Sequence, residues 1–206
     1  MSKFFKIHPE DPQPRLIRKS VEIIKNGGLV AYPTDSGYAL GCQLEDKKAL
    51  DTIRSIRKLD KNHNFTLLCR DMSEISKYAR FDTPVFRIIK ACTPGPYTFI
   101  LQATREVPRR LLHPKQKTVG IRIPDNKIDQ SILEELKQPL MTSTLIFPGE
   151  KYPCSDPSTI PSSLQSKIKL IISGGYCSRM PTSVIDLTDK KPKVLRKGKG
   201  PITHFL

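Results

Sequence analysis

Hydrophobic residues along the chain change their spacing several times, and each change marks an expected element. The clearest helical stripe is Ile17, Val21 and Ile24, which recur one turn apart and are followed by a pair of glycines that can end a helix. Similar stripes recur further along the chain. The predicted helices cover Pro14 to Asn26, Ala49 to Ile56, Pro84 to Lys90 and Asn126 to Leu136.

Short apolar or alternating runs between these helices predict strands. In the segment Thr118 to Ile123, Val119 and Ile121 share one face with Ile123, and the polar Thr118 and Arg122 share the other. The remaining predicted strands are Leu29 to Tyr32, Phe65 to Cys69, Tyr97 to Leu101, Leu140 to Phe147, Ile168 to Ile172, Ser183 to Leu187 and Lys193 to Arg196. Because helices and strands alternate, we expect an α/β (α+β) fold: one three-layer domain over residues 1–206, a twisted mixed sheet with helices on its faces.

The charge balance narrows the class of partner. The 206 residues include 35 Lys and Arg against 20 Asp and Glu, a net charge of +15. Such an excess suits a polyanionic partner, either nucleic acid or a polyphosphate ligand, and it equally serves solubility alone. No apolar run is long enough to cross a membrane, and the five cysteines never form C-x-x-C. We therefore expect a cytoplasmic protein with reduced thiols and no membrane partner.

Candidate chemistry is concentrated in small hydroxyls at the ends of predicted strands. The common phosphate-loop, dinucleotide, zinc-protease and serine-hydrolase motifs are absent from the sequence. The hydroxyl residues at strand ends are Thr34, Ser36, Thr142, Ser143, Thr144, Thr182 and Ser183. Together with Thr118 and the guanidinium groups of Arg122 and Arg196, they could converge on a phosphate-bearing ligand. Any one of them alone fits an ordinary turn or edge strand, and only the set favours a site.

The same residues resemble a known family. The segment Gly27–Gly41, GGLVAYPTDSGYALG, resembles the GG-hydrophobic-YPTDTVYGLG signature of the YrdC-like family, the threonylcarbamoyl-adenylate synthases. Further matches follow in family order, and the details look closest to the YciO branch. They are Pro94–Phe99 for PGPLTF, Thr118–Pro124 for TVAVRxP, Thr182–Asp186 for STVID and Leu195–Gly198 for LRxG.

The resemblance implies a reaction and a set of roles. Family enzymes join L-threonine, bicarbonate and ATP, with Mg²⁺, into threonylcarbamoyl-AMP and pyrophosphate, for tRNA threonylcarbamoyladenosine modification. By motif match, the threonine would be held by Thr34, Ser36, Arg122 and Thr182. The nucleotide would be held by Arg57, Lys58, Lys61, Thr118, Ser143, Thr144 and Arg196. No side chain is assigned as acid or base and none as a metal ligand, and Asp35 is expected to fix the turn.

Two segments depart from the family pattern. Relatives carry K-x-R-P-x-x-x-P-L after the second helix, whereas this chain has Arg57–Thr66, RKLDKNHNFT, without Arg-Pro. Where relatives have PLVATSAN, this chain has Pro139–Ile146, PLMTSTLI, so Thr144 replaces the serine and Ile146 the asparagine. If the lost amide holds the nucleotide, its absence costs on the order of 1 to 3 kcal/mol of binding energy.

These departures leave three hypotheses. The first, which we favour, is a threonylcarbamoyl-AMP synthase, slow or with an altered substrate. The second is a nucleotide-binding or double-stranded RNA-binding relative that does not make the adenylate, for which the charge of +15 is permissive. The third is another carbamoyl-adenylate or acyl-adenylate enzyme that uses the same residues.

Overall fold

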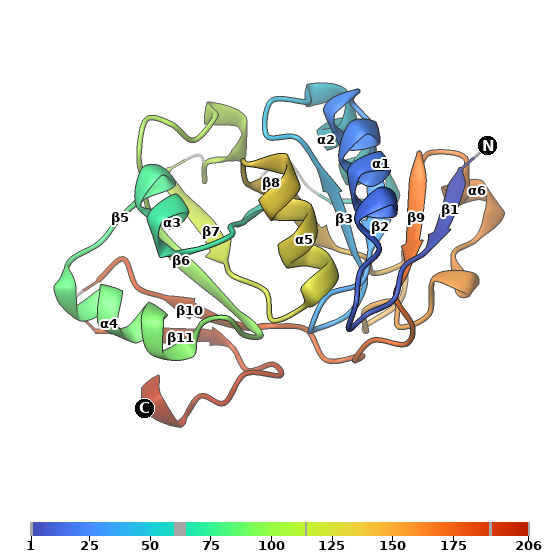
Figure 1. Ribbon diagram of the computed structural model, residues 1–206. Helices are drawn as coiled ribbons and strands as arrows, with labels where there is room; N and C mark the ends of the chain where they lie inside the picture. The colour runs from blue at the N-terminus through green and yellow to red at the C-terminus, as the bar shows by residue number, and fades with distance from the viewer. Residues whose placement is uncertain (1, 60–64, 114, 190, 206) are drawn as a thin grey trace.

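The fold is built on one continuous mixed sheet, seen in a computed structural model that describes residues 2–59, 65–113, 115–189 and 191–205 (Figure 1). The strands are β1 (Lys3–Lys6), β2 (Val30–Tyr32), β3 (Ala39–Cys42), β4 (Thr66–Leu68), β5 (Ala79–Arg80), β6 (Tyr97–Ala103), β7 (Thr118–Arg122), β8 (Leu140–Thr144), β9 (Leu170–Ser173), β10 (Ser183–Asp186) and β11 (Lys193–Arg196). The helices are α1 (Pro14–Lys25), α2 (Lys47–Arg57), α3 (Met72–Tyr78), α4 (Thr83–Cys92), α5 (Lys127–Leu136) and α6 (Ser162–Gln165).

The strand order brings distant parts of the chain together. The strands of the described residues follow the order β1-β9-β2-β3-β8-β4-β7-β6-β10-β11, and β5 pairs with β6. The pairs β2–β9, β4–β7 and β6–β10 are parallel, while β2–β3, β3–β8 and β6–β7 are antiparallel. The first and last strands therefore lie at opposite ends of the sheet (Figure 1). The predicted mixed sheet is confirmed.

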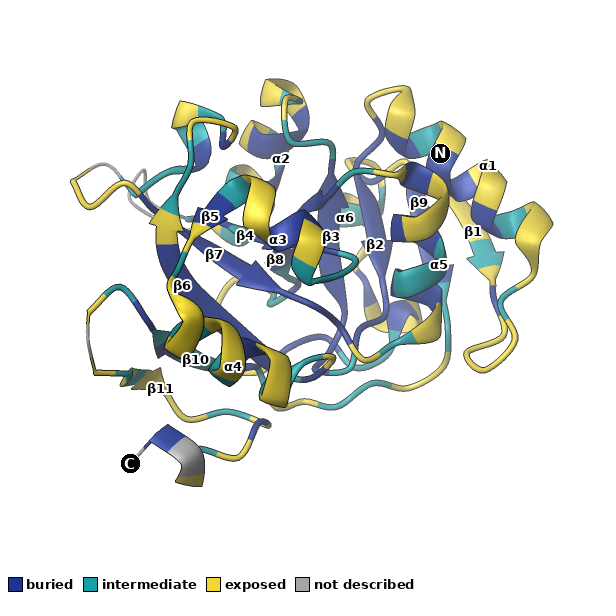
Figure 2. Ribbon diagram, turned by 60° about the vertical axis from the view of Figure 1, so that its left-hand side comes forward, coloured by how far each residue is buried: buried dark blue, intermediate teal, exposed yellow. Residues whose placement is uncertain are grey.

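The two faces of the sheet differ in composition. Paired residues point to the same face, so the register across β8, β4 and β7 puts Thr142, Thr66 and Gly120 side by side. The opposite face carries large apolar residues such as Leu40, Leu67 and Phe99 in a core that includes the inner side of α2. The central strands are buried, whereas the helices are exposed along their outer sides (Figure 2).

A second apolar layer covers part of the polar face. Residues of α1 and α5 pack there with β2, β8 and β9, and Tyr32 and Leu140 belong to this cluster. Helices therefore cover both faces, as the predicted three-layer arrangement requires. In the part of the chain that the structure describes, no helix has the length and apolar character needed to span a membrane.

The boundaries of α2 and α5 are set by their caps. Asp46 accepts a hydrogen bond from the backbone N–H of Ala49, and α2 ends at Lys58, which adopts the left-handed conformation with φ 49°. Asn126 accepts hydrogen bonds from the N–H groups of Ile128 and Asp129 at the start of α5. Arg57 is thus the last residue of α2, and Asp129 lies buried in the first turn of α5.

The sequence-based elements match the structure with identifiable differences. The segment predicted as a strand over Leu140 to Phe147 ends at Thr144, and the helix predicted over Pro84 to Lys90 extends over Thr83–Cys92. The strands β1, β3 and β5 and the helices α3 and α6 were not predicted. Strand β3, Ala39–Cys42, lacks β-branched residues and is defined by its hydrogen bonds to β2 and β8.

Candidate functional site

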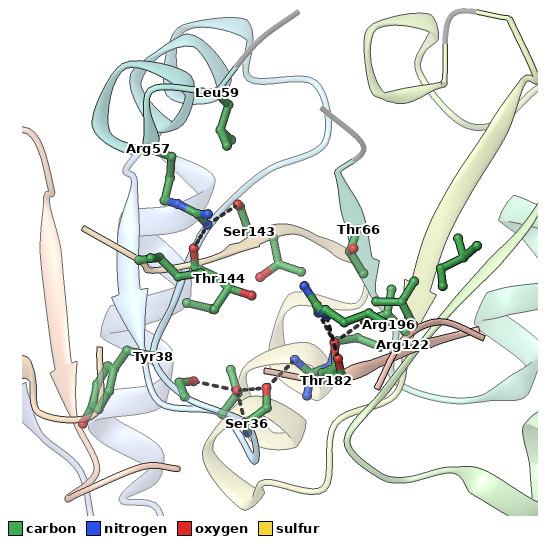
Figure 3. A pocket seen from close by; sticks show the side chains of 18 of the residues that line it. Ser36, Tyr38, Arg57, Leu59, Thr66, Arg122, Ser143, Thr144, Thr182 and Arg196 are labelled. Atoms are coloured by element: carbon green, nitrogen blue, oxygen red, sulfur yellow. Dashed lines mark hydrogen bonds between the residues drawn. The ribbon is translucent and has the colours of Figure 1, made fainter. Parts of the chain in front are cut away.

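A cavity of about 600 Å³ opens on the polar face, where β8 and β11 end and β3 and β10 begin (Figure 3). Its size suits a nucleotide-sized or amino-acid-sized ligand. The wall is a mixture of hydroxyls, cations and a few apolar side chains. Its hydroxyl and cationic residues are Thr34, Ser36, Tyr38, Arg57, Lys58, Thr66, Thr98, Arg122, Thr142, Ser143, Thr144, Thr182 and Arg196.

The floor of the cavity is the turn after β2. The Thr34 N–H and hydroxyl both donate to the Gly37 carbonyl, at 3.1 and 2.6 Å, and the Ser36 N–H donates to the Thr34 hydroxyl at 3.1 Å. Gly37 has φ +135°, and an added Cβ would lie 2.6 Å from the Pro153 Cβ. The turn therefore needs glycine, and it presents the Ser36 hydroxyl to the cavity (Figure 3).

Arg122 holds this turn from the end of β7. Its Nη2 forms an ion pair with Asp35 Oδ1, and its Nη1 donates to the Ser36 hydroxyl at 3.3 Å. The other oxygen of Asp35 accepts from the Asp125 N–H at 3.0 Å. The two side chains of the ion pair are only 6% and 7% exposed. Both carboxylate oxygens of Asp35 are thus engaged, so the residue fixes the turn and is poorly placed to act as a base.

A second cation, Arg196 at the end of β11, forms the part of the cavity wall next to β10. Arg196 Nε donates to the Thr182 carbonyl at 3.0 Å and Nη2 to the Thr182 hydroxyl at 3.1 Å. The Thr182 hydroxyl also pairs with the Thr98 hydroxyl at 2.9 Å. Arg196 is therefore fixed in direction by strand β10 while its charge faces the cavity without a carboxylate partner among the described residues.

A third cation comes from the end of α2. Arg57 Nη1 donates to the Thr144 carbonyl and, at 3.3 Å, to the Ser143 hydroxyl. Lys58 follows it and lines both this cavity and an adjoining hollow of about 460 Å³ beside Phe147. The α2 terminus thus supplies positive charge at the place where the sequence lacks the family's Arg-Pro segment.

The three guanidinium groups make the cavity electropositive. Burial lowers the pKa of Arg57 to about 10, and the charge of Arg196 acts in the same direction. Burial, and then the charge of Arg122, lower the pKa of Arg196. Asp35 balances only Arg122. An anionic ligand would relieve this mutual repulsion, so the cavity is suited to phosphate and carboxylate groups.

Most residues predicted from the sequence meet at this cavity. Thr34, Ser36, Arg57, Lys58, Arg122, Ser143, Thr144, Thr182 and Arg196 all line it. Thr118 does not, because it lies buried at the opposite end of β7, four residues before Arg122. Its placement gives the predicted nucleotide contact no support. Lys61 lies outside the described residues.

Sequence reasoning missed two threonines of the wall. Thr66 begins β4 and Thr98 lies inside β6, within runs that resemble ordinary buried strands. Thr66 comes beside Thr142, and Thr98 beside Val184, only through pairing between strands far apart in sequence. Strand register was the missing information.

The cavity offers little to a metal ion by itself. In the described ranges no group of three or more His, Cys, Asp or Glu residues could hold one. Asp35, in the turn that forms the floor of the cavity, is already paired with Arg122. A Mg²⁺ in this cavity would therefore have to arrive on the phosphates of a nucleotide, since this ion commonly keeps phosphate and water ligands.

Comparison with known proteins agrees with this architecture. Residues 22–198 match the Sua5/YciO/YrdC domain, whose description is telomere recombination. The chain belongs to the Sua5/YciO/YrdC family. YciO of Escherichia coli K12 is 53% identical over 206 residues and is covered completely, as is this chain. The crystal structure of E. coli YciO superimposes with a TM-score of 0.97 over the full length of both chains.

More distant members of the Sua5/YciO/YrdC family carry names that describe an activity. A threonylcarbamoyl-AMP synthase of Vibrio vulnificus is 24% identical over 186 residues, 88% of this chain and 98% of its own. The crystal structure of P. abyssi Sua5 complexed with L-threonine has a TM-score of 0.89 at 25% identity, covering 98% of this chain and 59% of that one. The family thus includes a protein whose crystal structure is a complex with L-threonine.

Proposed function

We propose that this protein is a threonylcarbamoyl-AMP synthase, which converts L-threonine, bicarbonate and ATP into threonylcarbamoyl-AMP and pyrophosphate. The observation that carries the proposal is the shared cavity: Ser36 and the three guanidinium groups of Arg57, Arg122 and Arg196 line the same space (Figure 3). The known relatives named for this activity, and the relative that binds L-threonine, share the fold. Such a product serves tRNA modification, which we place in the cytoplasm.

Each cation has a role in this proposal. Arg122 pairs with the threonine carboxylate, and the hydroxyls of Ser36 and Thr182 orient the amine and side chain. Arg57 and Arg196 contact the phosphates, which arrive with their own Mg²⁺. Held together, threonine and ATP react as neighbours, and this proximity replaces a protein acid or base as the main source of rate enhancement.

The reaction needs charge stabilisation above all. The threonine amine bonds to the bicarbonate carbon as a C–O bond breaks and water leaves, which gives a carbamate. An oxygen of this carbamate then bonds to the α-phosphorus while the bond from that phosphorus to the bridging oxygen breaks. Pyrophosphate leaves with the electrons of the broken bond. Negative charge therefore grows on the phosphate oxygens, and fixed guanidinium groups stabilise it without having to reorient.

Ile146, two residues after the end of β8, changes the wall of the cavity where we expect the nucleotide. Ile146 lines the cavity where the family motif has an asparagine. The nearby Thr144 carbonyl already accepts a hydrogen bond from Arg57. The nucleotide therefore meets an apolar wall in place of an amide. We expect weaker ATP binding than in a relative with the asparagine, and unchanged threonine contacts.

Pyrophosphate release tests the proposal. Purified protein with Mg-ATP, L-threonine and bicarbonate should release pyrophosphate, and leaving out either threonine or bicarbonate should stop it. Pyrophosphate release that does not depend on threonine would favour another adenylate-forming reaction. No release under any condition, together with RNA binding that weakens as salt rises, would favour the RNA-binding alternative.

Arg196→Ala should weaken ATP binding by about 10- to 100-fold, because a charge-assisted contact contributes about 1.5 to 3 kcal/mol. Threonine binding should change little, since Arg122 is retained. Lys193→Ala is the matched control, because Lys193 is an exposed cation on the same strand. Calorimetric titration with Mg-ATP measures the effect, and equal losses in both variants would contradict a specific role for Arg196.

A further inference from the structure

The molecule has a buried carboxylate directly behind the candidate threonine subsite. Asp129 is 1% exposed, and neither of its oxygens has a hydrogen-bond partner among the described residues. Buried carboxylates are normally paired or hydrogen-bonded, because an ionised group loses its hydration. Asp129 therefore calls for an explanation that the fold alone does not supply.

Stabilisation of helix α5 accounts for only part of this placement. Asp129 lies in the first turn of α5, where a negative charge interacts favourably with the helix dipole. That interaction is worth about 0.3 to 1 kcal/mol for an exposed side chain, and burial of an ionised carboxylate costs more. Asn126 already caps the first N–H groups of the helix.

Four groups from four segments interact electrostatically with Asp129. They are Arg122 from β7, Asp35 from the turn after β2, Tyr32 from β2, and Cys177 from the segment between β9 and β10. The Tyr32 hydroxyl is paired with the Thr142 hydroxyl at 2.6 Å. Arg122 is therefore the only cation in this group, and it interacts with two carboxylates, as an ion pair with Asp35 and through its charge with Asp129.

The state of Arg122 links Asp129 to the cavity. Arg122 is 5% exposed. Its Nη atoms bond to Asp35 and Ser36, and its buried Nε has no hydrogen-bond partner in the part of the chain that the structure describes. Burial raises the pKa of Asp129 well above its usual range; Arg122 opposes this shift and Asp35 adds to it. A ligand carboxylate at Arg122 would bring a third negative group to one guanidinium.

We propose that Asp129 is a positioning residue for the threonine subsite: when a ligand carboxylate pairs with Arg122, Asp129 takes up a proton from solvent. The protonated, neutral Asp129 leaves the charge of Arg122 to be shared by Asp35 and the ligand. Threonine binding then favours the protonated form, and by linkage the protonated form binds threonine more tightly. This inference rests on the proposed function, because it takes L-threonine as the ligand.

The test measures proton uptake during binding. L-threonine is titrated calorimetrically into the wild-type protein and into Asp129→Asn, in buffers of different ionisation enthalpy, from about pH 5 to pH 9. The wild type should take up additional protons, approaching about one per threonine, once the pH exceeds the pKa of free Asp129. Above that pH its affinity should fall by up to about tenfold per pH unit, and Asp129→Asn should lack both effects.

Matched controls separate charge from local structure. Asp125→Asn removes an exposed carboxylate from the same segment and should behave like the wild type. Urea unfolding without ligand reports on the titration of Asp129 itself. Burial raises the pKa of Asp129 in the folded protein above its pKa in the unfolded chain. The folded protein therefore keeps its full stability at pH values below the pKa of the unfolded chain, and it loses stability as the pH rises through the range up to the pKa of the folded protein. Asp129→Asn should therefore gain stability relative to the wild type as the pH increases.

The outcomes distinguish the two proposals. Threonine binding with the same proton uptake in the wild type and in Asp129→Asn would overturn the inference and leave the proposed function standing. Absence of threonine binding in both proteins would overturn the proposed function and the inference with it. Proton uptake that disappears only in Asp129→Asn would support both.

Discussion

Arg122→Ala should weaken L-threonine binding by on the order of 100-fold and lower the free energy of unfolding by about 3 kcal/mol. The loss of binding follows from removal of the cation that faces a ligand carboxylate beside Ser36. The loss of stability has a different origin. The Asp35 side chain is 7% exposed and would remain as a buried charge without its partner.

A double variant separates the two effects. Arg122→Ala combined with Asp35→Ala removes both charges, so much of the stability should return. Threonine binding should not return, because the cation is still missing. Urea unfolding and threonine titration of the two variants measure this. Recovery of binding in the double variant would show that Arg122 serves only to hold the Asp35 turn.

Gly198→Ala should lower the free energy of unfolding by about 3 kcal/mol and weaken ATP binding by about tenfold. A Cβ on Gly198 would lie 2.2 Å from the Pro181 carbonyl oxygen and 2.4 Å from the carbonyl carbon and oxygen of Thr182. These neighbours are all backbone atoms, so no side chain can turn away. The segment around Gly198 must therefore shift away from β10, which would break the hydrogen bonds between Arg196 and Thr182.

Gly149→Ala is the control for the loss of a glycine. Gly149 has φ +88° and an added Cβ would meet nothing within 4 Å, so the substitution should cost about 1 kcal/mol from backbone strain alone. Chemical unfolding and Mg-ATP titration of both variants test the difference. Equal losses of stability, or ATP binding unchanged in Gly198→Ala, would contradict a role for this close approach in positioning Arg196.

Strand β7 illustrates which features of the site could be predicted from the sequence and which could not. Alternation correctly put Thr118 and Arg122 on the same face of one strand. Four residues of strand span about 13 Å, however, so only one end of β7 can reach a given ligand. Which end borders the cavity depends on the strand order, which periodicity does not contain.

Contacts between segments far apart in sequence account for the rest of the site. The turn signature predicted Ser36 correctly as part of the cavity wall. The partners of that turn are Arg122, 87 residues after Asp35, and Lys199, which donates to the Asp35 carbonyl from 164 residues away. No local pattern marks such pairs. Asp129 was overlooked for the same reason, since an acidic residue near the start of a helix normally faces solvent.

The two outermost strands have a consequence for how copies of the protein meet. An edge strand exposes unpaired backbone groups that can pair with another chain. The strands at the two ends of the sheet order, β1 and β11, both begin and end with a cation, Lys3 and Lys6 in one and Lys193 and Arg196 in the other. Two copies that approach edge to edge would bring like charges together, so the molecule resists aggregation through its sheet while keeping Arg196 available to the cavity.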